Sequence, residues 1–412
     1  MQGEPKLWRA VPMALYAAFA LDAISLVFTT LVFGHHWFGT RLFLAWDGFG
    51  LAAMVLAIYG ALELASRFAG AARAGAIIVV IANGAMLVLQ IGLATYFDFK
   101  HTGPDWLLAA DRYAWDALFV AEAVGWTIAA WRVLPVAIPC GLVTLVMAIP
   151  REAFGDHASV KLDLVLRGLH WFALAMLVLF AARGITRPTP RRAAAGLRRA
   201  GASLVLRVVA AVVGTGTLVM FGVAGGRDQD VLRVGLLAGA GISAVALVLF
   251  ATGLLDAARA TLPGLPRWLL AVAATAALWV TGVATRQLPA LYIALYRPED
   301  SGHSDAMETA QALPIITLLV MTVAIVALLI AIASKLRAEA ASKGATAAVM
   351  WCTSAVLTAW AVPHAPSESA SAGVMLAAVF AMLWALLVLA SLCRTAADVI
   401  ERGPSLPGAR VV

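Results

Sequence analysis

Asp22 is the residue whose position most suggests chemistry, because it interrupts the apolar run MALYAAFALDAISLVFTT of residues 13–30. An ionised side chain at the centre of a membrane-spanning helix costs roughly 2.5–3.5 kcal/mol, so it faces protein or water rather than lipid. Ser25 and Thr29 follow at i+3 and i+7, on the same helix face. Such a carboxyl can bind and release a proton or a cation, or it can hydrogen-bond a neighbouring helix. We retain both interpretations for Asp22.

Four further polar residues lie inside apolar stretches: Asn83, Gln90, Glu122 and Arg286. Glu122 and Arg286 are candidates for coupling an ion or binding a substrate. The competing interpretation is a structural Glu122–Arg286 ion pair, near the outer ends of their helices. Asn83 and Gln90 are seven residues apart and share a helix face, which favours a role in helix packing. With Asp22, these residues form the candidate site for a solute or a coupling ion.

Other motifs for chemistry are weak. All seven histidines fall in predicted outer loops or at outer helix ends, without the spacing of a metal motif. The Gly-rich stretch 212–226 lies in a predicted span and lacks the lysine of a phosphate-binding loop. None of the three cysteines belongs to a CxxC pair. We predict no metal, no cofactor and no catalytic residue, and an enzyme that uses the acidic stretch 98–116 is the least favoured class.

The elements that must position these residues are membrane helices. Of the 412 residues, 62% are hydrophobic and only 13% are charged, which is too apolar for a soluble protein. A spanning helix needs roughly 20 apolar residues. We predict an all-α polytopic membrane protein with about twelve transmembrane helices, over residues 8–33, 43–65, 74–97, 115–131, 133–150, 164–183, 203–224, 232–256, 268–296, 310–334, 345–363 and 373–394. Only Arg132 separates the fourth span from the fifth, so these two are one long helix or a tight hairpin.

The net charge of +7 would suggest a nucleic-acid partner in a soluble protein. Here the basic residues gather in alternate loops, as the positive-inside rule requires, so we predict no nucleic-acid partner and place both termini in the cytoplasm. The first apolar run reads as an uncleaved anchor. The Ala-rich and Arg-rich composition favours a multi-pass protein of a bacterial inner membrane. The lipid bilayer is then the expected partner.

The predicted spans form two sets of six. We expect an N-terminal half over residues 1–186, a basic cytoplasmic linker over 187–202, a C-terminal half over 203–396 and a cytoplasmic tail over 397–412. ALELASRFAGAARAG (61–75) aligns with LLDAARATLPGLPRW (254–268), and CGLVTLVMAIP (140–150) aligns with CTSAVLTAWAVP (352–363). An even number of helices gives both halves the same orientation, so the internal repeat is a parallel duplication of a kind seen in secondary transporters.

The sequence GALELASRFAG (60–70) resembles the loop after helix 2 in the major facilitator superfamily. Arg67 and Phe68 fit that family's pattern, but Ser66 stands where the family has Asp. The layout of six plus six helices around a basic linker is also similar to that family, and the resemblance implies solute transport. Our first hypothesis is a secondary transporter or permease of a small solute, with proton or cation coupling through Asp22. The alternative is a non-catalytic membrane subunit, sensor or scaffold of a larger complex.

Overall fold

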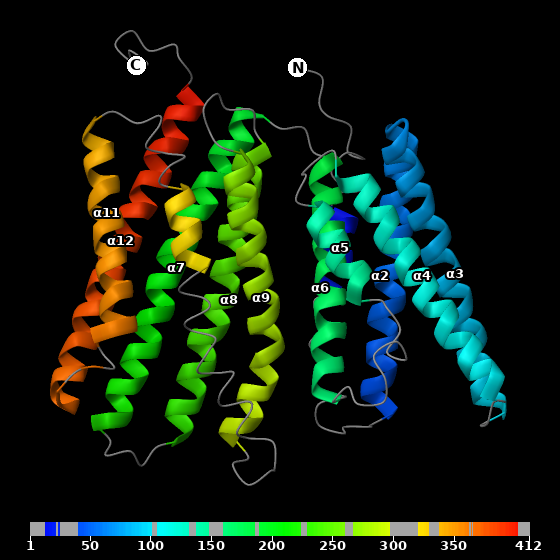
Figure 1. Cartoon of the computed structure of the whole chain (residues 1–412), viewed down its shortest axis with the longest axis horizontal. Helices are drawn as coiled ribbons and strands as arrows, with labels where there is room; N and C mark the ends of the chain where they lie inside the picture. Colours follow the sequence, from blue (N-terminus) through cyan, green and yellow to red (C-terminus); the bar gives the residue numbers. More distant parts are fainter. Residues whose placement is uncertain are drawn as a thin grey trace. The chain divides into compact units, whose positions relative to one another are not determined.

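The computed structural model describes most of the apolar stretches of the chain (Figure 1). The described residues are 13–21, 24, 40–100, 105–131, 137–147, 160–185, 189–223, 229–259, 267–296, 320–328, 338–361, 364 and 366–402. Every element in these ranges is a helix, which confirms the all-α class. Asp22 lies outside them.

Among the described residues, five helical segments are long and apolar enough to cross a membrane. They are Gly48–Arg67, Ala71–Gly92, Pro190–Thr217, Val234–Arg259 and Ser369–Glu401. The chain is therefore a helical membrane protein. The twelve spans and the two repeats stay predictions.

The chain divides into two compact units, Met1–Arg187 and Pro188–Val412. The first contains α2 (Thr40–Arg67), α3 (Ala71–Lys100), α4 (Asp105–Ala130), α5 (Ala137–Met147) and α6 (Val160–Ile185), and residues 13–21 are also helical. The second contains α7 (Pro190–Val223), α8 (Gln229–Arg259), α9 (Arg267–Tyr296), α11 (Ala338–Val356), the π-helix η2 (Leu357–Ala361) and α12 (Glu368–Arg402), and residues 320–328 are helical.

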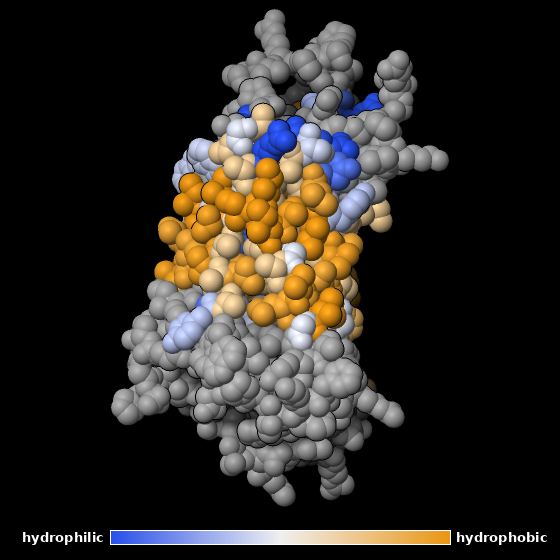
Figure 2. Space-filling view, turned by 90° about the vertical axis from the view of Figure 1, so that its right-hand side faces the viewer, coloured by the Kyte–Doolittle hydropathy of each residue, from blue (hydrophilic) through white to orange (hydrophobic). Residues whose placement is uncertain are grey.

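Helix α6 lies at the core of the first unit. Its residues Phe172–Arg183 are buried without interruption, and α2, α4 and α5 all contact it. Helix α3 packs against α2 and α4 and exposes apolar side chains such as Ile81 and Val88. Figure 2 views the side of the molecule on which α3 lies and shows a broad apolar surface there, as lipid contact requires.

The N-terminal helical residues are fixed to this unit by two contacts. Leu15 fills the space that Gly60 leaves open on α2. The guanidinium of Arg183, in the last turn of α6, lies 5.6 Å from the centre of the Tyr16 ring. A cation over an aromatic face, at the negative end of a helix, is favourable on both counts.

Glycines set the closest helix crossings in both units. A Cβ on Gly75 of α3 would lie 2.6 Å from the carbonyl oxygen of Gly125 on α4, so a larger residue does not fit there. A Cβ on Gly196 of α7 would likewise lie 2.7 Å from the carbonyl oxygen of Gly253 on α8. Small residues allow two helix backbones to approach closely, which is a common device in membrane proteins.

Helix α7 is central to the second unit, where it packs against both α8 and α12 (Figure 1). Helix α8 also packs against α9, and α11 packs against α12. On the face of α7 toward α12, Gly201 lies close to the backbone of Ala390 and to Cys393. The second unit is thus assembled around one long helix.

The basic segment of residues 187–202, which we predicted to be a linker, is helical from Pro190 onward. The reason is a helix-start signal that we did not use. The Thr189 hydroxyl accepts a hydrogen bond from the backbone N–H of Arg192 at 3.3 Å, as an N-cap residue does, and Pro190 occupies the first helical position. The charged turns of α7 therefore continue without a break into its apolar part.

The structure also describes the region of the predicted fourth and fifth spans. Helix α4 begins at Asp105, ten residues before the predicted span, so Glu122 is not near its outer end. Helices α4 and α5 are separate, and they contact each other. The described part of α5 has 11 residues, fewer than a membrane span needs.

Candidate functional site

The best-defined polar site joins α3 to α4 at Glu122. The Asn83 Nδ2 atom donates a hydrogen bond of 2.7 Å to Glu122 Oε1, and the Trp126 indole donates one of 3.2 Å to the same oxygen. Asn83 also donates to the carbonyl oxygen of Val79, one turn earlier, at 3.1 Å. Exposure is 5% for Glu122, 2% for Asn83 and 0% for Trp126. The carboxyl is therefore held rigidly inside the first unit.

Local sequence explains why these groups meet. Gly75 and Gly125 bring α3 and α4 into backbone contact, and Glu122 lies one turn before Gly125. Trp126 is four residues after Glu122, so its indole lies above the same helix face. Asn83 lies near the middle of the Ala71–Gly92 span. The carboxyl of Glu122, on α4, is thus placed beside the middle of the α3 span.

Both hydrogen-bond donors are neutral, and they converge on one carboxylate oxygen. Among the described side chains, none with a positive charge forms an ion pair with Glu122. The second oxygen, Oε2, receives neither of these bonds. A proton on Oε2 would therefore leave both bonds intact, so the site can hold the charged and the neutral carboxyl with the same geometry.

The structure describes the side chains of only part of the predicted candidate set. It brings Asn83 and Glu122 together, although we had assigned them different roles. Gln90 is two turns further along α3 and is half-buried. Arg286 belongs to α9 in the second unit, with a side chain outside the described part, so the proposed Glu122–Arg286 pair stays a prediction. Asp22 lies outside the described residues altogether.

His170 contradicts the prediction that every histidine lies in an outer loop or at an outer helix end. Helix α6 begins at Val160, so His170 is ten residues inside it, and it is buried. Its Nδ1 atom lies 3.0 Å from the carbonyl oxygen of Thr144, in the last turn of α5. Since a carbonyl only accepts, Nδ1 carries the hydrogen and caps the end of α5. The ring also meets Phe119 edge-on, with centroids 5.4 Å apart.

Sequence reasoning missed an ion-pair cluster at one end of the second unit. The Arg198 guanidinium donates to both oxygens of Glu401, at 2.9 and 2.7 Å, and to Asp398 at 2.7 Å. Arg199 pairs with Asp256 on α8 at 2.9 Å. These arginines belong to the segment that we had explained by topology alone. The acids opposite them, on α8 and α12, were the signal that could have revealed the cluster.

A second residue that we missed is Arg207, which lies within the Pro190–Thr217 span of α7. Its Nη1 atom donates a hydrogen bond of 3.2 Å to the hydroxyl oxygen of Ser243 on α8. Arg207 is the fifth residue of the predicted span 203–224, but it follows a long basic stretch, and so we did not single it out as a polar residue inside a span. The structure shows that it faces a neighbouring helix.

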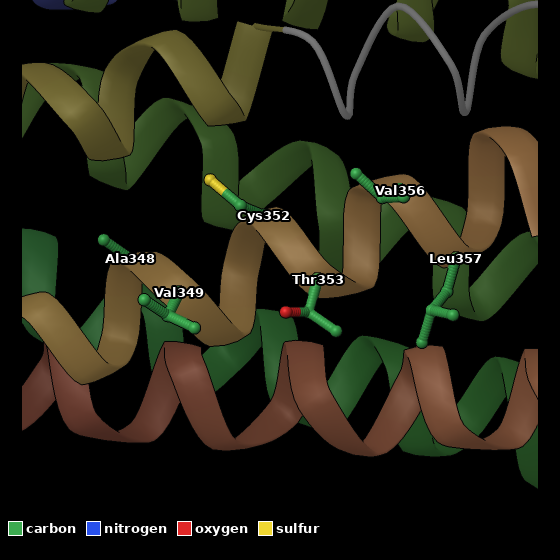
Figure 3. A pocket seen from close by; sticks show the side chains of 6 residues that line it. All are labelled: Ala348, Val349, Cys352, Thr353, Val356 and Leu357. Carbon is green, nitrogen blue, oxygen red and sulfur yellow. The ribbon is translucent and has the colours of Figure 1, made fainter.

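A shallow groove of about 460 Å³ lies along one face of α11. Figure 3 shows its lining residues on successive turns of that helix and on the first residue of η2: Ala348, Val349, Cys352, Thr353, Val356 and Leu357. None of these side chains is charged, and among them Thr353 alone carries a hydroxyl, so the groove is mostly apolar. Cys352 is exposed, whereas Cys140 and Cys393 are buried.

Comparison with known proteins gives no further assignment. The resemblance to the major facilitator superfamily therefore remains confined to residues 60–70 and to the predicted layout of helices. No family profile, no curated protein and no solved structure matches this chain.

Proposed function

We propose that this membrane protein is a secondary transporter of a small solute, coupled to protons or cations through a buried carboxyl. We place it in a bacterial inner membrane with both termini in the cytoplasm. The observation that carries the proposal is Glu122, which is buried at the level of a membrane span and held by two neutral donors.

The chemistry of the site favours coupling over a purely structural role. A carboxylate that serves only packing is most stable when a cation neutralises it, because an unpaired buried charge is costly. Glu122 instead has two donors that orient it in either protonation state. Since Oε2 takes part in neither bond, the proton can come and go without repacking α3 against α4. This is what a carrier that loads and releases a proton once per cycle requires.

The proposed parallel repeat gains support from α2 and α8. In the alignment of residues 61–75 with 254–268, Gly60 matches Gly253 and Glu63 matches Asp256. Gly60 is the position where α2 meets Leu15, and Gly253 is the position where α8 meets Gly196. Each glycine thus marks the close approach of the second helix of its unit to the first. Two similar halves are more typical of a transporter than of a non-catalytic membrane subunit.

The test is solute-driven proton movement in proteoliposomes that contain a trapped pH dye. Amino acids, monosaccharides, small carboxylates and alkali cations are added in turn to the purified full chain. We expect one class to drive proton flux and the Glu122→Gln variant to abolish it, because glutamine keeps the acceptor oxygen but carries no exchangeable proton.

Glu63→Gln is the matched control, since Glu63 pairs with Arg67 at the end of α2 and lies away from the Glu122 site. It should transport like the wild type. Asp22→Asn tests the coupling residue that the sequence alone suggested. Wild-type flux in Glu122→Gln would remove Glu122 from the mechanism, and a wild type that moves none of these solutes would contradict transport.

A further inference from the structure

Arg207 lies at an unusual depth for a positive charge in the second unit. It is eight residues beyond Arg199, which places it about 12 Å further along α7 at 1.5 Å per residue. Its partner Ser243 is nine residues from Val234 and thirteen from Asp256, so it lies near the middle of the α8 span. The hydrogen bond between them holds the guanidinium at that level.

The contact between α7 and α8 consists of small residues on both sides of Arg207. Toward the start of α7, Gly196 meets Gly253. Toward its end, a Cβ on Gly239 of α8 would lie 3.4 Å from the carbonyl oxygen of Ala210. The two helices therefore approach each other closely on both sides of the level at which Arg207 bonds to Ser243.

The acids of this unit whose side chains the structure describes form ion pairs with other arginines. Asp256 pairs with Arg199, and Asp398 and Glu401 pair with Arg198, all at the charged end of α7. No carboxylate of the described residues forms an ion pair with Arg207. Its hydrogen bond goes to the neutral hydroxyl of Ser243.

Among the side chains that the structure describes, no carboxylate balances the charge of Arg207. A guanidinium at membrane depth costs several kcal/mol unless it is paired, and a hydroxyl contributes a hydrogen bond but no opposite charge. A guanidinium has five N–H donors in a planar fork that matches a carboxylate. Arg207 as a residue is half-buried, and its bond to Ser243 uses one of the five donors.

We propose that Arg207 and Ser243 form a binding site for a small monocarboxylate. One guanidinium balances one negative charge, which fits a carboxylate better than a phosphate dianion. The Ser243 oxygen accepts from Arg207, and its hydroxyl hydrogen is then directed at the carboxylate. The proposal of a carboxylate-binding site does not depend on transport. That the carboxylate is also the transported substrate rests on the transport function proposed above.

The test is titration calorimetry of the purified full chain in detergent, with acetate as the probe and chloride and inorganic phosphate as comparison ions. We expect acetate binding in the wild type, at least tenfold weaker binding in Arg207→Gln and Arg207→Lys, and a smaller loss in Ser243→Ala. Lysine keeps the charge but loses the planar fork, so Arg207→Lys stays informative if glutamine impairs folding. Arg73→Gln, at an exposed arginine of α3, is the control that should bind acetate normally.

Two results would overturn the binding site. One is a wild type that does not bind acetate, because an acid of the chain then neutralises Arg207. The other is equal affinity in the wild type and in both Arg207 variants. Tighter binding of phosphate than of acetate overturns the carboxylate class.

Uptake of labelled acetate by proteoliposomes separates this inference from the proposed function. If acetate binding depends on Arg207 but no solute is taken up, the transport function is contradicted and the binding site is still supported. If the protein takes up another solute, and Arg207→Lys does not change that uptake, the transport function is supported. The Arg207 site is then not the binding site for the transported substrate.

Discussion

At the scale of single residues, two charged groups among the described side chains, Glu122 and Arg207, have neutral hydrogen-bond partners. Glu122 receives bonds from Asn83 and Trp126, and Arg207 donates to Ser243. Neutral partners fix the orientation of a charged group without cancelling its charge, so each group keeps the capacity to bind a proton or an ion. The sequence marked Glu122 because it interrupts an apolar run. We did not single out Arg207, because it follows other arginines near the start of its predicted span.

His170 gives a prediction at this scale. We expect His170→Phe to lower the free energy of unfolding by about 1–3 kcal/mol, because the Thr144 carbonyl loses its buried donor. Thr144→Val is the control, since the hydroxyl it removes bonds only to the Cys140 carbonyl of its own helix. Reversible unfolding of the full chain in mixed micelles measures both. Equal losses in the two variants would contradict the capping role of His170.

At the scale of elements, most helices could be predicted from apolar length, and their ends could not. The α4 helix extends ten residues beyond its predicted start, into an acidic stretch that we assigned to a loop. Thr189 and Pro190 form a helix-start signal at the beginning of α7, but the surrounding arginines led us to predict a linker. Charge density indicates which side of a membrane a segment occupies, and it does not decide whether the segment is helical.

Helix crossings give the prediction for this scale. We expect Gly253→Ala to destabilise the chain by about 1–3 kcal/mol, because the new methyl group meets the α7 backbone. Gly241→Ala, on the same helix, has open space around the new atom and should stabilise the chain by about 0.5–1 kcal/mol through helix propensity. The measurement is the change in unfolding midpoint of each variant relative to the wild type. A change of the same sign in both variants would argue against the close crossing.

At the scale of the whole molecule, composition alone was enough to establish a helical membrane protein. The packing of the helices inside each unit could not be predicted from the sequence, because an apolar stretch has the same composition whether it faces lipid or protein. Helix α6 and α3 illustrate this limit. Both are strongly apolar, yet Phe172–Arg183 are all buried while α3 exposes several large apolar residues.

The predicted orientation is testable with reporter fusions. We expect green fluorescent protein at the C-terminus to fluoresce and alkaline phosphatase there to be inactive, since both ends are predicted to be cytoplasmic. Phosphatase fused within residues 101–104, which follow α3, should be active. Activity of the C-terminal phosphatase fusion would imply an odd number of spans and would remove the parallel repeat.

The distribution of the three thiols has a practical consequence. Cys352 is exposed on the groove face of α11, five residues before η2 begins, while Cys140 and Cys393 are enclosed by their units. The native polypeptide therefore comes with a built-in attachment point for a fluorophore or spin label. Any rearrangement of α11 during a working cycle is open to direct spectroscopic observation without a single engineered substitution.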